Sequence, residues 1–139
     1  MKTRMFIVLA IAAVLAGVAL SYLWFTNFSV FIVHEVGMDL KVVGVGLVGV
    51  NTDTDAIHFG KVPKGSGSQR ILTLENNDNR PHTIVIKTFG NISGFVFVTE
   101  NNFVMGPGTI KNVTIMAKVP ENTNEGYYDG VLQAIFMNG

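Results

Sequence analysis

Residues 5–25 form an uninterrupted apolar run, MFIVLAIAAVLAGVALSYLWF, without a charged side chain. A helix rises about 1.5 Å per residue, so a run of this length spans roughly 30 Å, the thickness of the hydrocarbon core of a bilayer. In hydrocarbon, a helix satisfies its backbone hydrogen bonds internally. The sequence therefore predicts one transmembrane helix, with the lipid bilayer as a partner of the chain and all later residues on one side of the membrane.

The charges that flank this run predict its direction of insertion. Lys2 and Arg4 precede it, and the next basic residue is Lys41. Positive charge next to a membrane span tends to stay in the cytoplasm. We therefore expect a single-pass protein of the cell membrane, with residues 1–4 in the cytoplasm and the C-terminal part outside the cell.

A cleaved signal peptide is the alternative interpretation of the same run. Gly17 and Ala19 are small residues of the kind found at a cleavage site. The run is longer than the usual apolar core of a signal peptide, about 7–15 residues, and it continues into YLWF rather than into polar residues. Both interpretations place the rest of the chain outside the cytoplasm.

Composition excludes several classes of function. After the two basic residues at the N-terminus, 8 basic residues stand against 10 acidic ones, and no basic patch is present, so nucleic acid is not expected as a partner. The chain has no cysteine, which excludes disulfides, thiol catalysis and cysteine-ligated zinc. The chain beyond the helix is long enough for one domain, and its core alone must hold it together.

The sequence after the helix predicts β-strands. Residues 109–119 alternate most regularly, with Val113, Ile115, Ala117 and Val119 on one face. A further strand is predicted in the Val- and Gly-rich segment 39–50. Five more are predicted in short runs bounded by turn clusters: 56–62, 69–76, 82–89, 94–99 and 127–137. Phe103 and Val104 lie among turn residues. We therefore expect an all-β domain over residues 39–139, an antiparallel sandwich of about seven strands.

Residues 26–38, TNFSVFIVHEVGM, connect the helix to this domain and are apolar and rich in β-branched residues. They fit a juxtamembrane segment or the first strand of the domain. Residues 28–36 also fit a strand that is donated to a neighbouring subunit. Phe31 and Val33 are therefore candidates for contact with a partner.

Three segments together resemble immunoglobulin-like modules of exported proteins: IHFGKVPKGSGSQRILTLENND at residues 57–78, MGPGTIKNVTIMAKVP at 105–120 and GYYDGVLQAIF at 126–136. The resemblance implies an immunoglobulin-like β-sandwich. With the single helix, the chain is similar in plan to archaeal surface proteins, namely stator-type components of the archaellum and donor-strand filament subunits. The residues KTRM before the apolar run differ from the usual archaeal pilin leader.

Three Asn residues begin N-x-Ser/Thr sequons and are candidates for glycosylation in an exported domain: Asn27, Asn91 and Asn112. Asn112 falls on the polar face of its predicted strand, and Asn91 lies beside a turn. Asn27 lies close to the predicted membrane span. The surroundings therefore favour Asn91 and Asn112 over Asn27 as sites of modification.

No set of residues indicates catalysis or a cofactor. His34, His58 and His82 lie on separate predicted strands without metal-ligand spacing, and Asp53 with Asp55 supplies too few ligands for calcium. No nucleophile elbow, phosphate loop or dinucleotide fingerprint is present. We therefore expect a protein that is not an enzyme and has no cofactor.

Two adjacent aromatic residues are the remaining interaction candidates. Tyr127 and Tyr128 are neighbours on a predicted strand and must point to opposite faces, so one of them is expected to face outward. The predicted function is tethering, adhesion or scaffolding within a surface layer or envelope assembly, with an envelope protein or a second copy as partner. The alternatives are a secreted filament subunit that polymerises through residues 28–36 and a metal-binding envelope domain.

Overall fold

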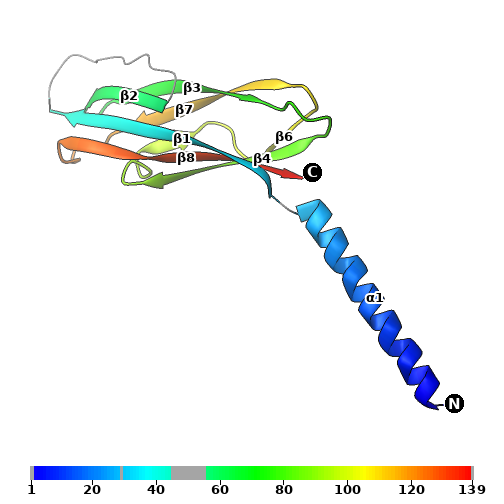
Figure 1. Ribbon diagram of the computed structural model, residues 1–139. Coiled ribbons are helices and arrows are strands. Elements are labelled where there is room, and N and C mark those ends of the chain that lie inside the picture. The colour runs from blue at the N-terminus through cyan, green and yellow to red at the C-terminus, as the bar shows by residue number, and fades with distance from the viewer. Residues whose placement is uncertain (1, 29, 45–55, 139) are drawn as a thin grey trace.

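In this computed structural model, residues 2–28, 30–44 and 56–138 are described, and they comprise one helix followed by eight strands (Figure 1). A single residue separates the helix from the first strand. The elements in chain order are α1 (Lys2–Phe28), β1 (Val30–Val43), β2 (Ala56–Pro63), β3 (Gly67–Glu75), β4 (His82–Gly90), β5 (Val96–Val98), β6 (Phe103–Met105), β7 (Ile110–Lys118) and β8 (Gly126–Asn138).

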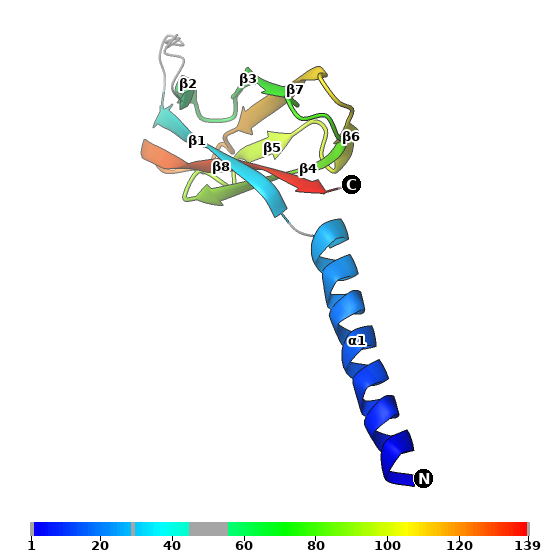
Figure 2. The ribbon, with the colours of Figure 1, turned by 45° about the vertical axis from the view of Figure 1, so that its right-hand side comes forward.

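The helix α1 stands away from the strands, as Figures 1 and 2 show. The span Thr3–Thr26 is long and apolar enough to cross a membrane, and every residue in it is exposed. The core helix of a soluble protein would bury one face, and α1 is instead apolar all round. The predicted apolar helix is confirmed, and its length and composition fit a membrane span or a signal sequence.

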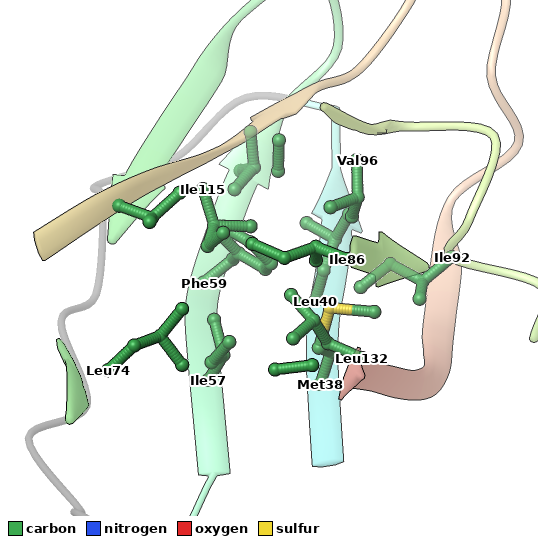
Figure 3. Close-up of a cluster of buried hydrophobic side chains, with 14 of the residues drawn as sticks. Met38, Leu40, Ile57, Phe59, Leu74, Ile86, Ile92, Val96, Ile115 and Leu132 are labelled. Atoms are coloured by element: carbon green, nitrogen blue, oxygen red, sulfur yellow. The ribbon is translucent and has the colours of Figure 1, made fainter. Parts of the chain in front are cut away.

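The strands form two sheets. The larger sheet has the order β2-β1-β8-β4-β6, and the smaller one has the order β3-β7-β5. Residues on the inward faces of both sheets belong to one buried cluster, part of which Figure 3 shows. Its largest fully buried members include Phe59, Leu40, Ile84, Ile115 and Leu132. Two sheets that each bury one face in this way enclose a single core.

The structure has eight described strands rather than about seven. The additional strand is β6, which pairs with the first residues of β4 and covers the positions predicted as turn residues. Of its three residues, only Met105 is buried. A strand that buries one side chain has no alternation to detect, which is why the sequence pattern missed it.

The prediction that all strands pair antiparallel was wrong at one edge, because β1 and β2 are parallel. Parallel neighbours need a crossover of a dozen or more residues, and 44–55 lie between these two strands. The strand predicted over 39–50 ends at Val43, and residues 45–55 lie outside the described part of the chain. The sequence pattern did not reveal that β2 runs alongside β1 in the same direction.

The domain has two ends, which we name by their distance from α1 along β1. The proximal end holds the start of β1, the end of β8 and the turns at residues 76–81 and 106–109. The distal end holds the turns at residues 64–66, 91–95 and 119–125. Figure 1 shows the end of β8 beside the end of α1, in agreement with this assignment.

Candidate functional site

The strand β1 is paired on both sides over only part of its length. It pairs with β8 from Val30 to Val42, but its pairing with β2 begins at Gly37. Within the described residues, no strand therefore pairs with the second side of residues 30–36. We call this segment the open edge.

Backbone alternation identifies the groups that the open edge presents. The N–H of Lys64 donates to the carbonyl oxygen of Val43 at 3.1 Å, so the backbone polar groups of Val43 point to the β2 side. In a strand every second residue points the same way, and the register of β1 against β8 is regular from Ile32 onward. The N–H and C=O groups of Val33 and Glu35 therefore face the open edge.

A cleft lies between the sheets beside the open edge. Ile32, His34 and Val36 continue the inward row of β1 beyond Met38. Val36 is half-buried, whereas Ile32 and His34 are exposed, Ile32 by 41%. The cleft consists of two adjoining hollows of about 410 Å³ and 310 Å³, which share His34, Glu75, Asn77 and Phe136. The other residues that line it are Ile32, Val36, Leu72, Thr73, Leu74, Asn76, Asp78, His82 and Ala134.

The lining of the cleft combines apolar and acidic groups. The ring of His34 lies 5.5 Å from that of Phe136 in an edge-on arrangement, so the histidine packs on an apolar neighbour. Val36 and Leu72 pack against the core at the inner part of the cleft. The two carboxylates that line it belong to Glu75 and Asp78, so the cleft is acidic.

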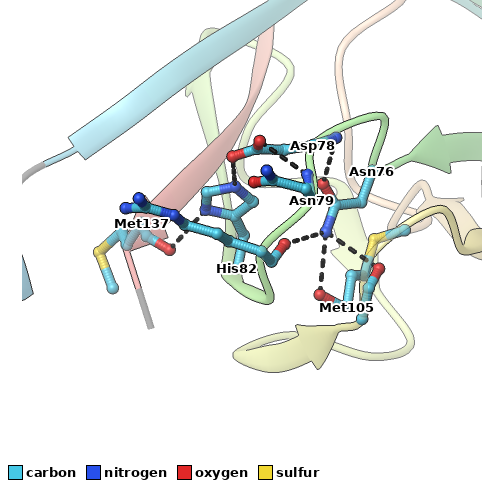
Figure 4. A network of polar contacts seen from close by, with 8 residues as sticks. Asn76, Asp78, Asn79, His82, Met105 and Met137 are labelled. Atoms are coloured by element: carbon cyan, nitrogen blue, oxygen red, sulfur yellow. Dashed lines mark hydrogen bonds and ion pairs between the residues drawn. The ribbon is translucent and has the colours of Figure 1, made fainter.

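His82 and Asp78 form a polar pair at the proximal wall, which Figure 4 shows. His82 is buried, and its Nε2 lies 2.9 Å from Oδ2 of Asp78 while its Nδ1 lies 3.3 Å from the carbonyl oxygen of Met137. The hydrogen bond from His82, followed by that from the backbone N–H of Asn79, lowers the pKa of Asp78. The carboxylate is therefore held in its charged form at neutral pH.

Asn76 fixes the turns behind this pair. Its buried Nδ2 donates to the carbonyl oxygens of Arg80, Met105 and Gly106 at 2.9, 3.1 and 3.0 Å, and its Oδ1 accepts from the N–H of Asp78 at 3.1 Å. One side chain thus joins the turn after β3 to the turn after β6 (Figure 4). This network adds to the pairing of β3 with β7 and of β4 with β6 and β8, which also holds the wall of the cleft.

Two other strand edges of the domain, at β2 and at β4, are covered by side chains. Nε of Arg70 donates to the carbonyl oxygen of His58 at 2.8 Å, and Oγ of Ser68 donates to that of Phe59 at 3.3 Å, so β3 covers the outer side of β2. At β4, Asn101 replaces a strand residue, because its amide both donates to and accepts from the backbone of Ile86. No corresponding side chain from a described residue reaches the open edge.

The predicted glycosylation candidates lie apart from the cleft. Asn91 is exposed in the turn after β4, and its Oδ1 accepts from the N–H of Asp129 at 2.7 Å. Asn112 is exposed on the outer face of β7, where its Oδ1 accepts from Oγ1 of Thr73 at 2.9 Å. Asn27 belongs to α1, and its side chain is outside the described part. Modification of these residues remains a prediction.

The predicted interaction candidates divide between the two ends. Tyr127 is 71% exposed near the distal end, with Nζ of Lys41 5.3 Å from its ring centroid, whereas Tyr128 is half-buried and its ring packs edge-on against Phe95. Val33 is part of the open edge, and its side chain is exposed. Phe31 is in β1, but its side chain lies outside the described part.

The structure does not gather the histidines into one site. His58 pairs with Asp39 across β1 and β2, His34 packs on Phe136, and His82 pairs with Asp78. Among the described residues, no group of three or more His, Asp or Glu side chains is arranged to hold a metal ion. Asp53 and Asp55 lie outside these residues.

Sequence patterns identified neither the open edge nor the cleft, because both arise from where β2 begins to pair. Arg70, Asn76 and Asn101 were likewise missed, since a polar residue that bonds a distant backbone leaves no local pattern. Comparison of the chain with protein-family models, with curated proteins and with solved structures gave no match. The function of this protein is therefore inferred from the geometry of its helix and its domain.

Proposed function

We propose that the protein is a membrane-anchored, non-catalytic scaffold that holds a β-rich binding domain at the outer surface of the cell membrane. The observation that carries this proposal is the exposure of every residue of α1 from Thr3 to Thr26. An apolar helix with no protein surface around it requires another apolar environment, which a bilayer supplies.

The short connection between helix and domain supports a scaffolding role. Only Ser29 separates α1 from β1, so the chain has no long flexible linker between its anchor and its first strand. A flexible linker lets a domain search a large volume, and a direct connection limits its distance from the membrane. The open edge is accordingly held a few residues from the end of the anchor.

Orientation and fold class are parts of the same proposal. Lys2 and Arg4 favour a cytoplasmic N-terminus and an extracellular domain. Two sheets around one core support an immunoglobulin-like sandwich within a surface or envelope assembly. On this topology Asn91, which is exposed in a distal turn, is the sequon we favour for glycosylation.

The filament-subunit alternative receives less support from the pairing of β1. Residues 30–36 are hydrogen-bonded to β8 of their own domain, and donation of residues 28–36 to a neighbour would break that pairing. Such a subunit would also need α1 to be removed as a signal sequence. The scaffold requires neither event.

The test is the state of the N-terminus in native membranes. We expect protein extracted with detergent, and not with alkaline carbonate, to have an intact mass that includes α1. A membrane-impermeant amine reagent applied to whole cells should label lysines of the domain and leave Lys2 unlabelled. Val14→Arg, which places a charge in the middle of the span, should release or destabilise the membrane-bound form. A secreted chain that begins after α1 would refute the anchor.

A further inference from the structure

We propose that the open edge of β1 binds an extended segment of another protein by strand addition. The segment places an apolar side chain in the cleft and a Lys or Arg two positions further along. This inference rests on the proposed scaffold function and names the class of partner that the scaffold binds. Strand addition uses backbone hydrogen bonds for affinity and pockets for alternate side chains for selectivity.

The backbone of the open edge has the hydrogen-bonding groups for this pairing. Val33 and Glu35 direct their N–H and C=O groups away from β8, on the same side of β1 that β2 occupies from Gly37 onward. An incoming strand would therefore extend the larger sheet in line with β2. The backbone ladder of β1 would then be complete along both sides.

The sequence of this segment lacks the usual protection of an edge strand. Residues 30–36 read VFIVHEV, with neither Lys nor Pro. Proteins commonly blunt exposed edges with lysine, proline or covering side chains, and the neighbouring β2 is covered by Arg70 and Ser68. Glu35 is the one Asp, Glu, Lys or Arg of this segment, and no side chain from the described residues covers the backbone edge. Such a largely apolar edge is suited to pairing with another chain.

The cleft specifies which side chains the segment carries. In an added strand, alternate side chains point to the inward face, next to Ile32, His34 and Val36. The hollow that Val36 and Leu72 line fits an apolar group, whereas the adjoining hollow has the carboxylate of Asp78, and Glu75 lines both. A cation two residues from the apolar group would meet these carboxylates, which gives the proposed pattern.

A second copy of this chain fits the open edge less well. Figures 1 and 2 show β1 continuing from α1 in the direction that leads away from the helix. Copies anchored in one membrane therefore send β1 the same way, and an antiparallel pairing of two open edges would need one strand reversed. The closed symmetry of a two-fold dimer cannot use this edge between parallel anchors.

The experiment uses the full-length protein, labelled with ¹⁵N and reconstituted in lipid nanodiscs. The probe is an acetylated and amidated seven-residue peptide with Thr at its odd positions, Val at positions two and four, and Lys at position six. The control probe has the same sequence with its three central amides N-methylated, so that it cannot donate those hydrogen bonds. Titration is followed by backbone amide chemical shifts.

Two variants test the two components of recognition. Val33→Pro removes an N–H from the open edge and leaves the pairing with β8, whereas Val33→Thr keeps the N–H as its matched control. We expect Val33→Pro to weaken binding about tenfold and Val33→Thr to change it by less than about twofold. Glu75→Gln should weaken binding about threefold and reduce its dependence on salt.

The outcomes separate this inference from the proposed function. Shifts confined to residues 32–36 and 72–78, lost with the N-methylated probe and in Val33→Pro, would support strand addition. No binding of the peptide, or equal binding of both probes, would overturn it. Shifts of residues 32–36 that depend on nanodisc lipid instead of peptide would assign the edge to the membrane surface and also overturn it. Retention of α1 in the nanodisc would support the membrane-anchored scaffold function even where strand addition is overturned.

Discussion

The two halves of β1 have the same inward row of side chains but different surroundings. In the distal half, Leu40 and Val42 are covered by the smaller sheet and β2 pairs alongside. In the proximal half, Ile32 and His34 point to the same face but line an open cleft, and no described strand pairs along the neighbouring edge. One continuous strand thus serves as core at one end and as exposed surface at the other.

This difference shows that strand pairing and burial end together. The smaller sheet reaches β2 through the side chains of Ser68 and Arg70, and where β2 stops, that cover stops as well. The proximal half is instead held from the side, by β8 and by the turns that Asn76 joins. The domain can therefore keep an open edge without losing its core.

The largest expected difference between the halves is in stability. Leu40→Ala removes a side chain with 0% exposure and should lower the free energy of unfolding by about 2–5 kcal/mol. Ile32→Ala, on the same face of the same strand, should cost less than about 1 kcal/mol because Ile32 is largely hydrated. Urea denaturation in detergent micelles measures both values. Equal losses would mean that the cleft is packed as tightly as the core.

A slightly smaller effect is expected from the network that holds the proximal end. Asn76→Ala removes the buried donor to the carbonyl oxygens of Arg80, Met105 and Gly106 and should destabilise the domain by about 2–3 kcal/mol. The matched control is Asn77→Ala, since Asn77 is exposed. If the two variants unfolded at the same urea concentration, the Asn76 network would contribute nothing and the proximal end would depend on strand pairing.

Removing the side chain that covers β2 should lower the free energy of unfolding by a smaller amount. Arg70→Ala removes the donor to the carbonyl oxygen of His58 and should cost about 1–2 kcal/mol. Gln69→Ala is the control, because the side chain of Gln69 is exposed. Its backbone oxygen accepts from Nη1 of Arg70, and this bond is kept when only the side chain of Gln69 is removed. Amide exchange in β2 should accelerate in Arg70→Ala and remain slow in Gln69→Ala. Unchanged exchange in both would show that β2 needs no cover.

The smallest effect is expected from pH at the cleft wall. The folded pKa of Asp78 lies below its ordinary value of 3.8, so its ionised form stabilises the fold. That contribution is complete above about pH 4 and is lost as the pH falls through the folded pKa. Between about pH 5 and pH 3, the stability of Asp78→Asn should therefore fall less steeply than that of the unchanged protein. Parallel curves would show that Asp78 does not contribute to the loss of stability in acid.

The sequence predicted those features whose cause is local. The apolar run gave α1, and alternation within residues 109–119 gave β7 with Val113, Ile115 and Ala117 buried. Tyr127 and Tyr128 point to opposite faces, as strand geometry requires. Features that depend on pairing between distant segments were not predicted. The parallel β2, the short β6 and the open edge depend on which strands meet, and a one-dimensional pattern does not contain that information.

Residue-resolved hydrogen exchange of β1 in the full-length protein tests the open edge most directly. We expect the amides of Val33 and Glu35 to exchange rapidly, because no strand among the described residues pairs with them on that side. Those of Asp39 and Lys41, which point the same way but lie beside β2, should be protected, as should that of His34, which faces β8. Protection of Val33 and Glu35 equal to that of Asp39 and Lys41 would show that the edge is already covered, and would contradict the proposed binding site.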